Sequence, residues 1–166
     1  MTYPYRAILT PIEFDDSSLV ALDLAKQIAT DNQATVHLLH VAQRLPAFGE
    51  SEIIEDRDSP EEKKARATLL EIAKHHLTGA RHEIHTASAA PRALAKAVVQ
   101  VATAVSVDLI ILSTHGRKGL SRFILGNVAE EVVRTAPCPT LLIHRTTQAE
   151  EQAPATAEPE AQAMTP

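Results

Sequence analysis

The sequence contains few of the residue types that mark several common classes of protein. Its single cysteine, Cys138, cannot form a disulfide within the chain, which excludes a disulfide-stapled scaffold and fits a reducing compartment. Tryptophan is absent and aromatic residues make up 3% of the chain, so the core must consist mainly of aliphatic side chains. Glycine is also scarce. Three of the five glycines lie close together at Gly116, Gly119 and Gly126, so this segment is the first candidate for a functional loop.

Long apolar runs and basic patches are missing as well. No run approaches the roughly 18 apolar residues of a membrane span, and the amino terminus is polar where a signal peptide needs an apolar stretch. We therefore expect a soluble, cytoplasmic protein with no membrane partner. The net charge is -5, and the segment after Arg145 contributes four glutamates and no lysine or arginine. The remainder is almost neutral, which gives no electrostatic footprint for nucleic acid.

Composition divides the chain into one domain and a tail. Residues 1–146 are long enough for one aliphatic core. Residues 147–166 are rich in Ala, Glu, Pro and Thr without apolar periodicity, so we expect a disordered acidic tail. Residues 43–58, with Pro46, Gly49 and five acidic residues, are predicted to form a mobile surface loop.

Short apolar segments alternate with segments of helical periodicity. The five predicted strands are residues 8–12, 36–41, 83–87, 108–112 and 139–144. Between them lie four predicted helices. The first has several possible N-caps, at Asp15, Asp16, Ser17 and Ser18, and the others start at the Ser59-Pro60-Glu61-Glu62 capping box, at Ser88 with Pro91, and at Asn127. Five strands alternating with four helices predict an α/β fold, a doubly wound five-stranded parallel sheet with helices on both faces.

The glycine segment lies between the fourth strand and the fourth helix. Glycine allows close approach of a ligand to the backbone, and the N–H groups of a first helical turn favour a phosphate. We expect Asn127 to cap that helix, with Glu130 as its partner. The spacing is neither a Walker motif nor a dinucleotide fingerprint. A purely structural role, with the glycines forming only a tight connection, is the alternative.

The spacing instead resembles the universal stress protein family, whose nucleotide-binding members carry Gly-x2-Gly-x9-Gly followed by Ser or Thr. This chain reads Ser113-x2-Gly116-x9-Gly126-Asn127, so two of the four positions depart. The segments YRAILTPIEFDDSSLVALDLAKQIA and ATVHLLHVA resemble the same family. The likeness covers about residues 5 to 145, and it implies a flavodoxin-like or Rossmann-like sheet with strand order 3-2-1-4-5.

In that order, strands 1 and 4 lie side by side and their connections leave in opposite directions, which opens a crevice at their carboxyl ends. The resemblance implies that ATP or a related adenine nucleotide binds there, with Mg²⁺ carried by a triphosphate. Glu13 stands where the family often has Asp. The site residues that the resemblance and the strand ends imply are Pro11, Ile12, Glu13 and Val41 for the adenosine, Leu112 and Ser113 at the fourth strand, and Gly116, Gly126, Asn127 and Val128 for the phosphates.

Two functions remain open. The first is a nucleotide-dependent homodimer acting in the stress response, and the second is a nucleotide-independent dimeric interaction module of the same family. The resemblance implies pairing through the last strand, which begins at Pro139 and ends at His144. The cations Arg117, Lys118 and Arg122 could meet phosphates or form a solvated basic rim.

No catalytic or metal centre is predicted. The chain lacks a Gly-x-Ser-x-Gly elbow, and adjacent Asp15 and Asp16 are typical helix caps, so slow ATP hydrolysis or self-phosphorylation is the most we expect. His37 and His40, like His82 and His85, are three apart on strands, so each pair should point to opposite faces. We therefore expect no closed set of metal ligands. Cys138 is expected to be a packing residue.

Overall fold

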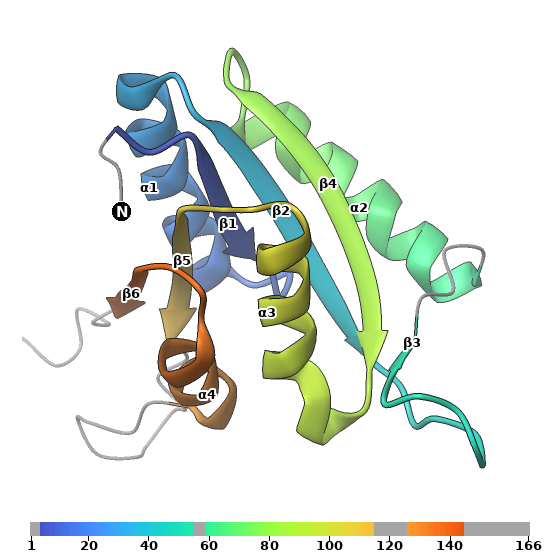
Figure 1. Cartoon of the computed structure of the whole chain (residues 1–166). Helices are drawn as coiled ribbons and strands as arrows, with labels where there is room; N and C mark the ends of the chain where they lie inside the picture. The colour runs from blue at the N-terminus through green and yellow to red at the C-terminus, as the bar shows by residue number, and fades with distance from the viewer. Residues whose placement is uncertain (1–3, 55–58, 115–125, 145–166) are drawn as a thin grey trace, which may run out of the picture.

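The computed structural model describes residues 4–54, 59–114 and 126–144, and in them a six-stranded sheet forms the middle layer (Figure 1). The strands are β1 (Ala7–Pro11), β2 (Thr35–Gln43), β3 (Ile53–Ile54), β4 (Arg81–Ala89), β5 (Leu109–Thr114) and β6 (Thr140–His144). Their order is β3-β4-β2-β1-β5-β6. Without the short β3, the five remaining strands are parallel and have the predicted order 3-2-1-4-5, which confirms the fold.

The helices lie on both faces of the sheet. They are α1 (Asp16–Asn32), α2 (Pro60–His76), the 3₁₀ turn η1 (Pro91–Ala93), α3 (Leu94–Ala104) and α4 (Asn127–Thr135). In Figure 1, α3 and α4 lie in front of the sheet and α1 and α2 behind it. None of the helices in the described ranges is both long and apolar enough to cross a membrane.

Two aliphatic clusters hold the layers together. Ile8 of β1 packs in the cluster on the α1 and α2 face, and Leu9 packs in the cluster on the α3 and α4 face. Both side chains are 0% exposed. β1 is therefore buried on both faces, which explains why its sequence is continuously apolar rather than alternating. Leu22 of α1 and Leu69 of α2 are buried in the first cluster, and Val98 of α3 is buried in the second.

Two predicted helix caps are confirmed, with one difference. The carboxylate of Asp15 accepts from the N–H of Ser18 at 2.9 Å, and the hydroxyl of Ser59 accepts from the N–H of Glu62 at 3.2 Å. A capping box would return the Glu62 carboxylate to the start of its own helix. That carboxylate instead accepts hydrogen bonds from Thr86 Oγ1 at 3.0 Å and Ser88 Oγ at 3.1 Å on β4. Glu62 is 2% exposed, so it ties α2 to the sheet.

At two other predicted helix starts, helical structure begins at Pro91 and at Asn127 as expected, but neither Ser88 nor the Asn127 side chain caps it. Ser88 lies inside β4, and helical structure begins with η1 at Pro91. Asn127 is the first residue of α4, and its N-cap is Gly126, with no side-chain cap hydrogen bond. A capping side chain must belong to a residue with non-helical backbone, which is Gly126 here.

The predicted loop over residues 43–58 is partly ordered. β2 continues to Gln43, and β3 pairs antiparallel with the end of β4. The N–H of Arg44 donates to Ala89 O at 2.9 Å, and the N–H of Ala90 donates to Glu52 O at 2.8 Å. Backbone pairing therefore fixes both ends of the segment between β2 and β3, and residues 55–58 lie outside the described part of the chain.

Candidate functional site

The carboxyl ends of β1 and β5 lie beside one another. Their parallel register pairs Ile8 with Leu109 and Leu9 with Ile110. The helix that follows β1 lies on one face of the sheet and the helix that follows β5 lies on the other (Figure 1). The two chain connections therefore diverge at this point, which is where ligands of open α/β sheets bind.

The end of β1 is held in a fixed and strained turn. The N–H of Ile12 donates to Leu39 O at 2.7 Å, and Ile12 O accepts from His40 Nδ1 at 2.8 Å. Phe14 has a φ of 59°, a left-handed conformation that costs a non-glycine residue about 1 kcal/mol or more. Its ring stacks on His40 with the ring centroids 4.1 Å apart. This stack supports the strained turn and presents Glu13 at the surface.

The same turn leads directly into α1. The N–H of Glu13 donates to Ser18 Oγ at 3.3 Å. The carboxylate of Asp15 accepts from Ser17 Oγ at 2.9 Å and from the N–H of Ser18 at 2.9 Å. Asp15 therefore acts as a helix cap, as the sequence predicts.

The β5 side of the junction is mostly buried. Leu112 and Thr114 are buried, and Ser113 between them is half-buried. Thr114 Oγ1 and His144 Nδ1 are hydrogen-bonded at 3.1 Å across β5 and β6. Val41 is half-buried on β2, next to β1. The predicted adenosine residues therefore come from β2 and from the end of its neighbour β1, on the side of the sheet where the parallel strands end.

The described part of the fold does not require a glycine at position 126. Its φ of -64° and ψ of 147° suit any residue, and a Cβ at this position would meet none of the described residues within 4 Å. Gly79, in contrast, has a φ of +81° that disfavours other residues. In the described part of the chain, nothing fills the position of a side chain at Gly126, in front of the first turn of α4, where the N–H groups of a helix lack intrahelical partners.

The other predicted phosphate residues divide into two groups. Asn127 and Val128 form the first turn of α4, and the side chain of Val128 packs in the cluster on the α3 and α4 face. Only the backbone of Val128 can therefore face a ligand at this helix start. Gly116 lies outside the described residues, as do Gly119 and the cations Arg117, Lys118 and Arg122.

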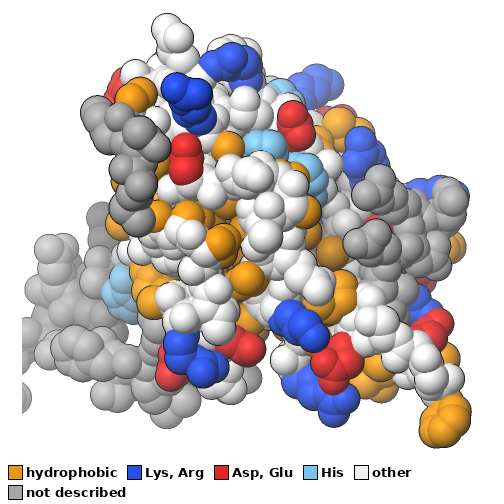
Figure 2. Space-filling model, viewed as in Figure 1, with side chains coloured by type: hydrophobic (Ala, Val, Ile, Leu, Met, Phe, Trp, Pro, Cys, Tyr) orange, Lys and Arg blue, Asp and Glu red, His pale blue; other side chains and the backbone are white. Residues whose placement is uncertain are grey.

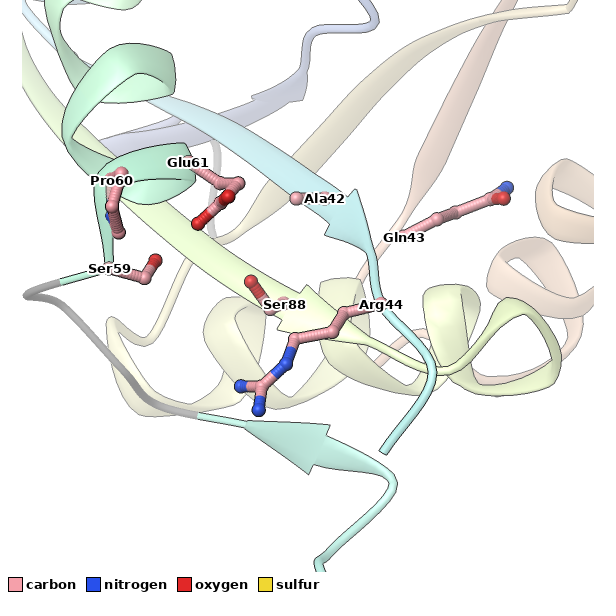
Figure 3. Close-up of a pocket in the computed structure, with 7 residues that line it drawn as sticks. All are labelled: Ala42, Gln43, Arg44, Ser59, Pro60, Glu61 and Ser88. Atoms are coloured by element: carbon pink, nitrogen blue, oxygen red, sulfur yellow. The ribbon is translucent and has the colours of Figure 1, made fainter. Parts of the chain in front are cut away.

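A pocket of about 630 Å³ lies one strand away from the predicted site (Figure 3). It opens at the ends of β2 and β4 beside the start of α2. Figure 3 shows Gln43 pointing away from the other labelled side chains. Arg44 Nη2 lies 3.4 Å from a carboxylate oxygen of Glu50, so its charge is partly neutralised. The lining residues are Ala42, Gln43, Arg44, Ser59, Pro60, Glu61 and Ser88, and no predicted site residue is among them.

Cys138 lies just before β6, at the amino-terminal ends of the parallel strands and so away from the candidate site. It is half-buried and packs against the cluster on the α3 and α4 face. Burial raises the pKa of the Cys138 thiol, and the nearby negative charge of Asp108 raises it further. The Asp108 carboxylate accepts from the N–H groups of Arg6 and Ala7 at 2.8 and 3.2 Å. A raised pKa disfavours the reactive thiolate, which supports a packing role for Cys138.

Comparison with known proteins connects this geometry to one family. The model described as "Universal stress protein family" matches residues 4–144. Universal stress protein MJ0531 of Methanocaldococcus jannaschii is 31% identical over 146 residues, covering 85% of this chain and 83% of that protein.

Two solved structures of similar fold contain nucleotides. A universal stress protein in complex with cAMP has a TM-score of 0.63 and 24% identity, covering 84% of this chain and 97% of that one. The universal stress protein from Archaeoglobus fulgidus in complex with dAMP has a TM-score of 0.58 and 22% identity, covering 83% and 97%. At these identities the likeness shows the shared fold.

Proposed function

Because the chain belongs to the universal stress protein family, we propose that it binds ATP or a related adenine nucleotide at the carboxyl ends of β1 and β5. The nucleotide would control a dimeric regulator of the stress response. Structures of the same fold contain cAMP and dAMP, which supports an adenine nucleotide as the ligand class.

The conformation of Gly126 carries this proposal. Glycine at the N-cap of α4 is required neither by a positive φ nor by a close neighbour among the described residues. Ser or Asn would cap a helix at least as well. A ligand that approaches the first turn of α4 gives glycine a purpose here, because a Cβ would occupy the space of the approaching group. Phosphate is the group that the free N–H donors and the helix dipole favour.

The remaining site residues are proposed by their positions around this point. Pro11, Ile12 and Glu13 would lie along the adenosine, and the backbone of Val41 would meet the adenine edge. Leu112 and Ser113 would lie beneath the nucleotide. The phosphates would lie against Gly126, Asn127 and the backbone of Val128, together with Gly116. Mg²⁺ would enter with a bound triphosphate.

The dimer is proposed through β6. Among the described residues no strand pairs with the outer side of β6, and Leu141 is 38% exposed. An unpaired edge strand with exposed apolar side chains promotes association. A second copy would cover residues 139–144. Light scattering at micromolar concentration is expected to give twice the mass of one chain, and a monomer mass would contradict the dimer.

The ligand can be identified directly. Freshly purified full-length protein is denatured, and any released nucleotide is identified by mass spectrometry. Stripped protein is then titrated with ATP and Mg²⁺ in a calorimeter, with GTP as the matched control. We expect an adenine nucleotide in the extract or a saturable heat with ATP that exceeds the heat with GTP. An empty protein with no heat from ATP, AMP or cAMP would overturn nucleotide binding.

A nucleotide-independent interaction module is the second candidate. The loop between β2 and β3 favours it, because Leu45 is 80% exposed and Phe48 is fully exposed. Exposed apolar side chains on a loop are available to a partner protein. This candidate predicts that the dimer forms equally well with and without ATP. Light scattering of stripped protein at both conditions separates the two functions.

A further inference from the structure

The strands β2 and β4 bring together two histidines that are 48 positions apart in the sequence. The parallel register pairs His37 with Glu83 and Leu39 with His85. Alternate residues of a strand share a face, so the three polar side chains point to the same side of the sheet. Figure 2 shows histidine side chains beside an acidic one over the upper parts of these strands.

The spacing of the three side chains suits a metal ion. His37 Nδ1 lies 3.0 Å from His85 Nε2 and 3.7 Å from Glu83 Oε2, and His85 Nε2 lies 3.9 Å from Glu83 Oε2. Bonds of about 2.0–2.2 Å in a tetrahedral zinc site separate neighbouring ligand atoms by about 3.3 Å. The observed separations lie on either side of that value, so small side-chain rotations would place all three atoms around one ion.

We propose that His37, His85 and Glu83 form a binding site for a divalent transition-metal ion, with Zn²⁺ as the ion that the ligand set suits. Two imidazole nitrogens and one carboxylate oxygen are a ligand set that zinc uses, whereas Mg²⁺ and Ca²⁺ prefer oxygen alone. Three protein ligands leave one position of a tetrahedron open. Solvent reaches the site from the side of Glu83, whose side chain is 62% exposed.

The scaffold fixes the ligands more firmly than a loop would. β2 and β4 are paired over nine residues, from Thr35 with Arg81 to Gln43 with Ala89. The His37 side chain is 8% exposed, so its neighbours restrict its rotation. Ligands on paired strands of a packed sheet lose little freedom when the ion binds.

The protonation of His37 is compatible with this role. Burial lowers the pKa of His37 more than the nearby Glu83 carboxylate raises it. A ring that is neutral at neutral pH keeps a lone pair for an ion, which a protonated ring lacks. The competing arrangement is a simple hydrogen bond in which one imidazole donates to the other. Only the metal site requires Glu83.

Zinc titration of nucleotide-free protein tests the site independently of ATP binding. The full-length chain without an affinity tag is treated with a chelator and titrated calorimetrically with Zn²⁺. We expect one ion per chain, with affinity lowered about 10-fold or more in both Glu83→Gln and His85→Ala, since even outer-sphere partners of a metal contribute 10–100-fold. His82→Ala is the matched control on the same strand, because His82 points to the other face and is exposed. It should bind as the parent does.

Cobalt provides the geometric readout. Co²⁺ bound by four ligands absorbs visible light far more strongly than hexaaqua Co²⁺, so the parent and His82→Ala should develop an intense visible band. Glu83→Gln, which alters an exposed side chain and should not affect folding, should lose most of that band. Absence of Zn²⁺ binding by the parent, or a Zn²⁺ affinity in Glu83→Gln and His85→Ala that equals the parent's, would overturn the site and leave the imidazole hydrogen bond.

Discussion

The carboxyl ends of β1 and β5 and the amino-terminal halves of β2 and β4 present two different kinds of candidate site. At the first, a strained turn at Phe14 follows β1, and no described residue fills the position of a side chain at Gly126, beside the backbone N–H groups that begin α4. At the second, His37, His85 and Glu83 point their own donor atoms at one another across two strands. The first candidate site depends on open space beside backbone N–H groups, and the second depends on the donor atoms of side chains.

This contrast determines which substitutions should matter at each place. A site made of space and backbone is lost when a side chain is added. A site made of side-chain donors is lost when one is removed. Each region should therefore be insensitive to the kind of change that destroys the other.

The largest expected effect is at Gly126. Gly126→Val should abolish ATP binding, because a branched side chain would fill the space in front of α4, while the backbone at φ -64° accepts valine. Calorimetric titration with ATP and Mg²⁺ gives the affinity, and circular dichroism checks the fold. Zinc affinity should stay unchanged. Full retention of ATP affinity in Gly126→Val would remove α4 from the nucleotide site.

The next largest effect is at Glu62, which lies on the face of β4 opposite to Glu83 and His85. Glu62→Ala should destabilise the protein by about 2–4 kcal/mol, because it leaves the half-buried hydroxyl of Thr86 and the buried hydroxyl of Ser88 without their hydrogen-bond acceptor. Urea unfolding measures the change. Glu62→Gln is the control. Its amide oxygen still accepts one of these hydrogen bonds, so its free energy of unfolding should fall by less. Zinc binding by the still-folded fraction should persist, because the candidate metal ligands lie on the other face.

A smaller effect of opposite sign is expected at Ser113. Ser113→Gly restores the first glycine of the family spacing, so ATP affinity should be preserved or increased. Glycine inside a strand should lower the free energy of unfolding by about 0.5–1 kcal/mol. Calorimetry and urea unfolding of the same preparation separate the two effects. Weaker ATP binding would show that the Ser113 hydroxyl contributes to the site.

The smallest effect concerns Cys138, which belongs to neither region. Its raised pKa means that little thiolate is present at pH 8, so it should react with a disulfide reagent more slowly than a cysteine peptide. The reaction rate of Cys138 should continue to increase to a higher pH than the rate of the cysteine peptide does. ATP should not alter the rate of Cys138. Reaction as fast as that of the peptide would contradict the packing role.

The parts of the fold that local sequence pattern determines were predictable. The apolar runs around Ile8 and Ile110 identified the central strands, and the carboxylate of Asp15 and the hydroxyl of Ser59 cap helices as expected. The strand order followed from the family resemblance and placed β1 beside β5. These features depend on near neighbours in sequence or on the fold as a whole.

The missed features depend on which residues meet across the sheet. The alternation of side chains along one strand predicts that His37 and His40 lie on opposite faces, but it cannot pair His37 with His85 on another strand. That pairing needs both the adjacency and the register of β2 and β4. The hydrogen bonds from Thr86 and Ser88 to Glu62 have the same origin, because a capping-box pattern describes only the local alternative.

The most direct test of the central claim is a two-dimensional amide NMR titration of the stripped, full-length protein with ATP and Mg²⁺. We expect the largest shifts at the N–H groups of Gly126, Asn127 and Val128, with further shifts at Glu13 and Val41. Shifts confined to Arg44, Ser59 and Glu61 would move the ligand to the pocket beside α2. Those shifts, or none at any concentration of ATP, would contradict a nucleotide site between β1 and β5.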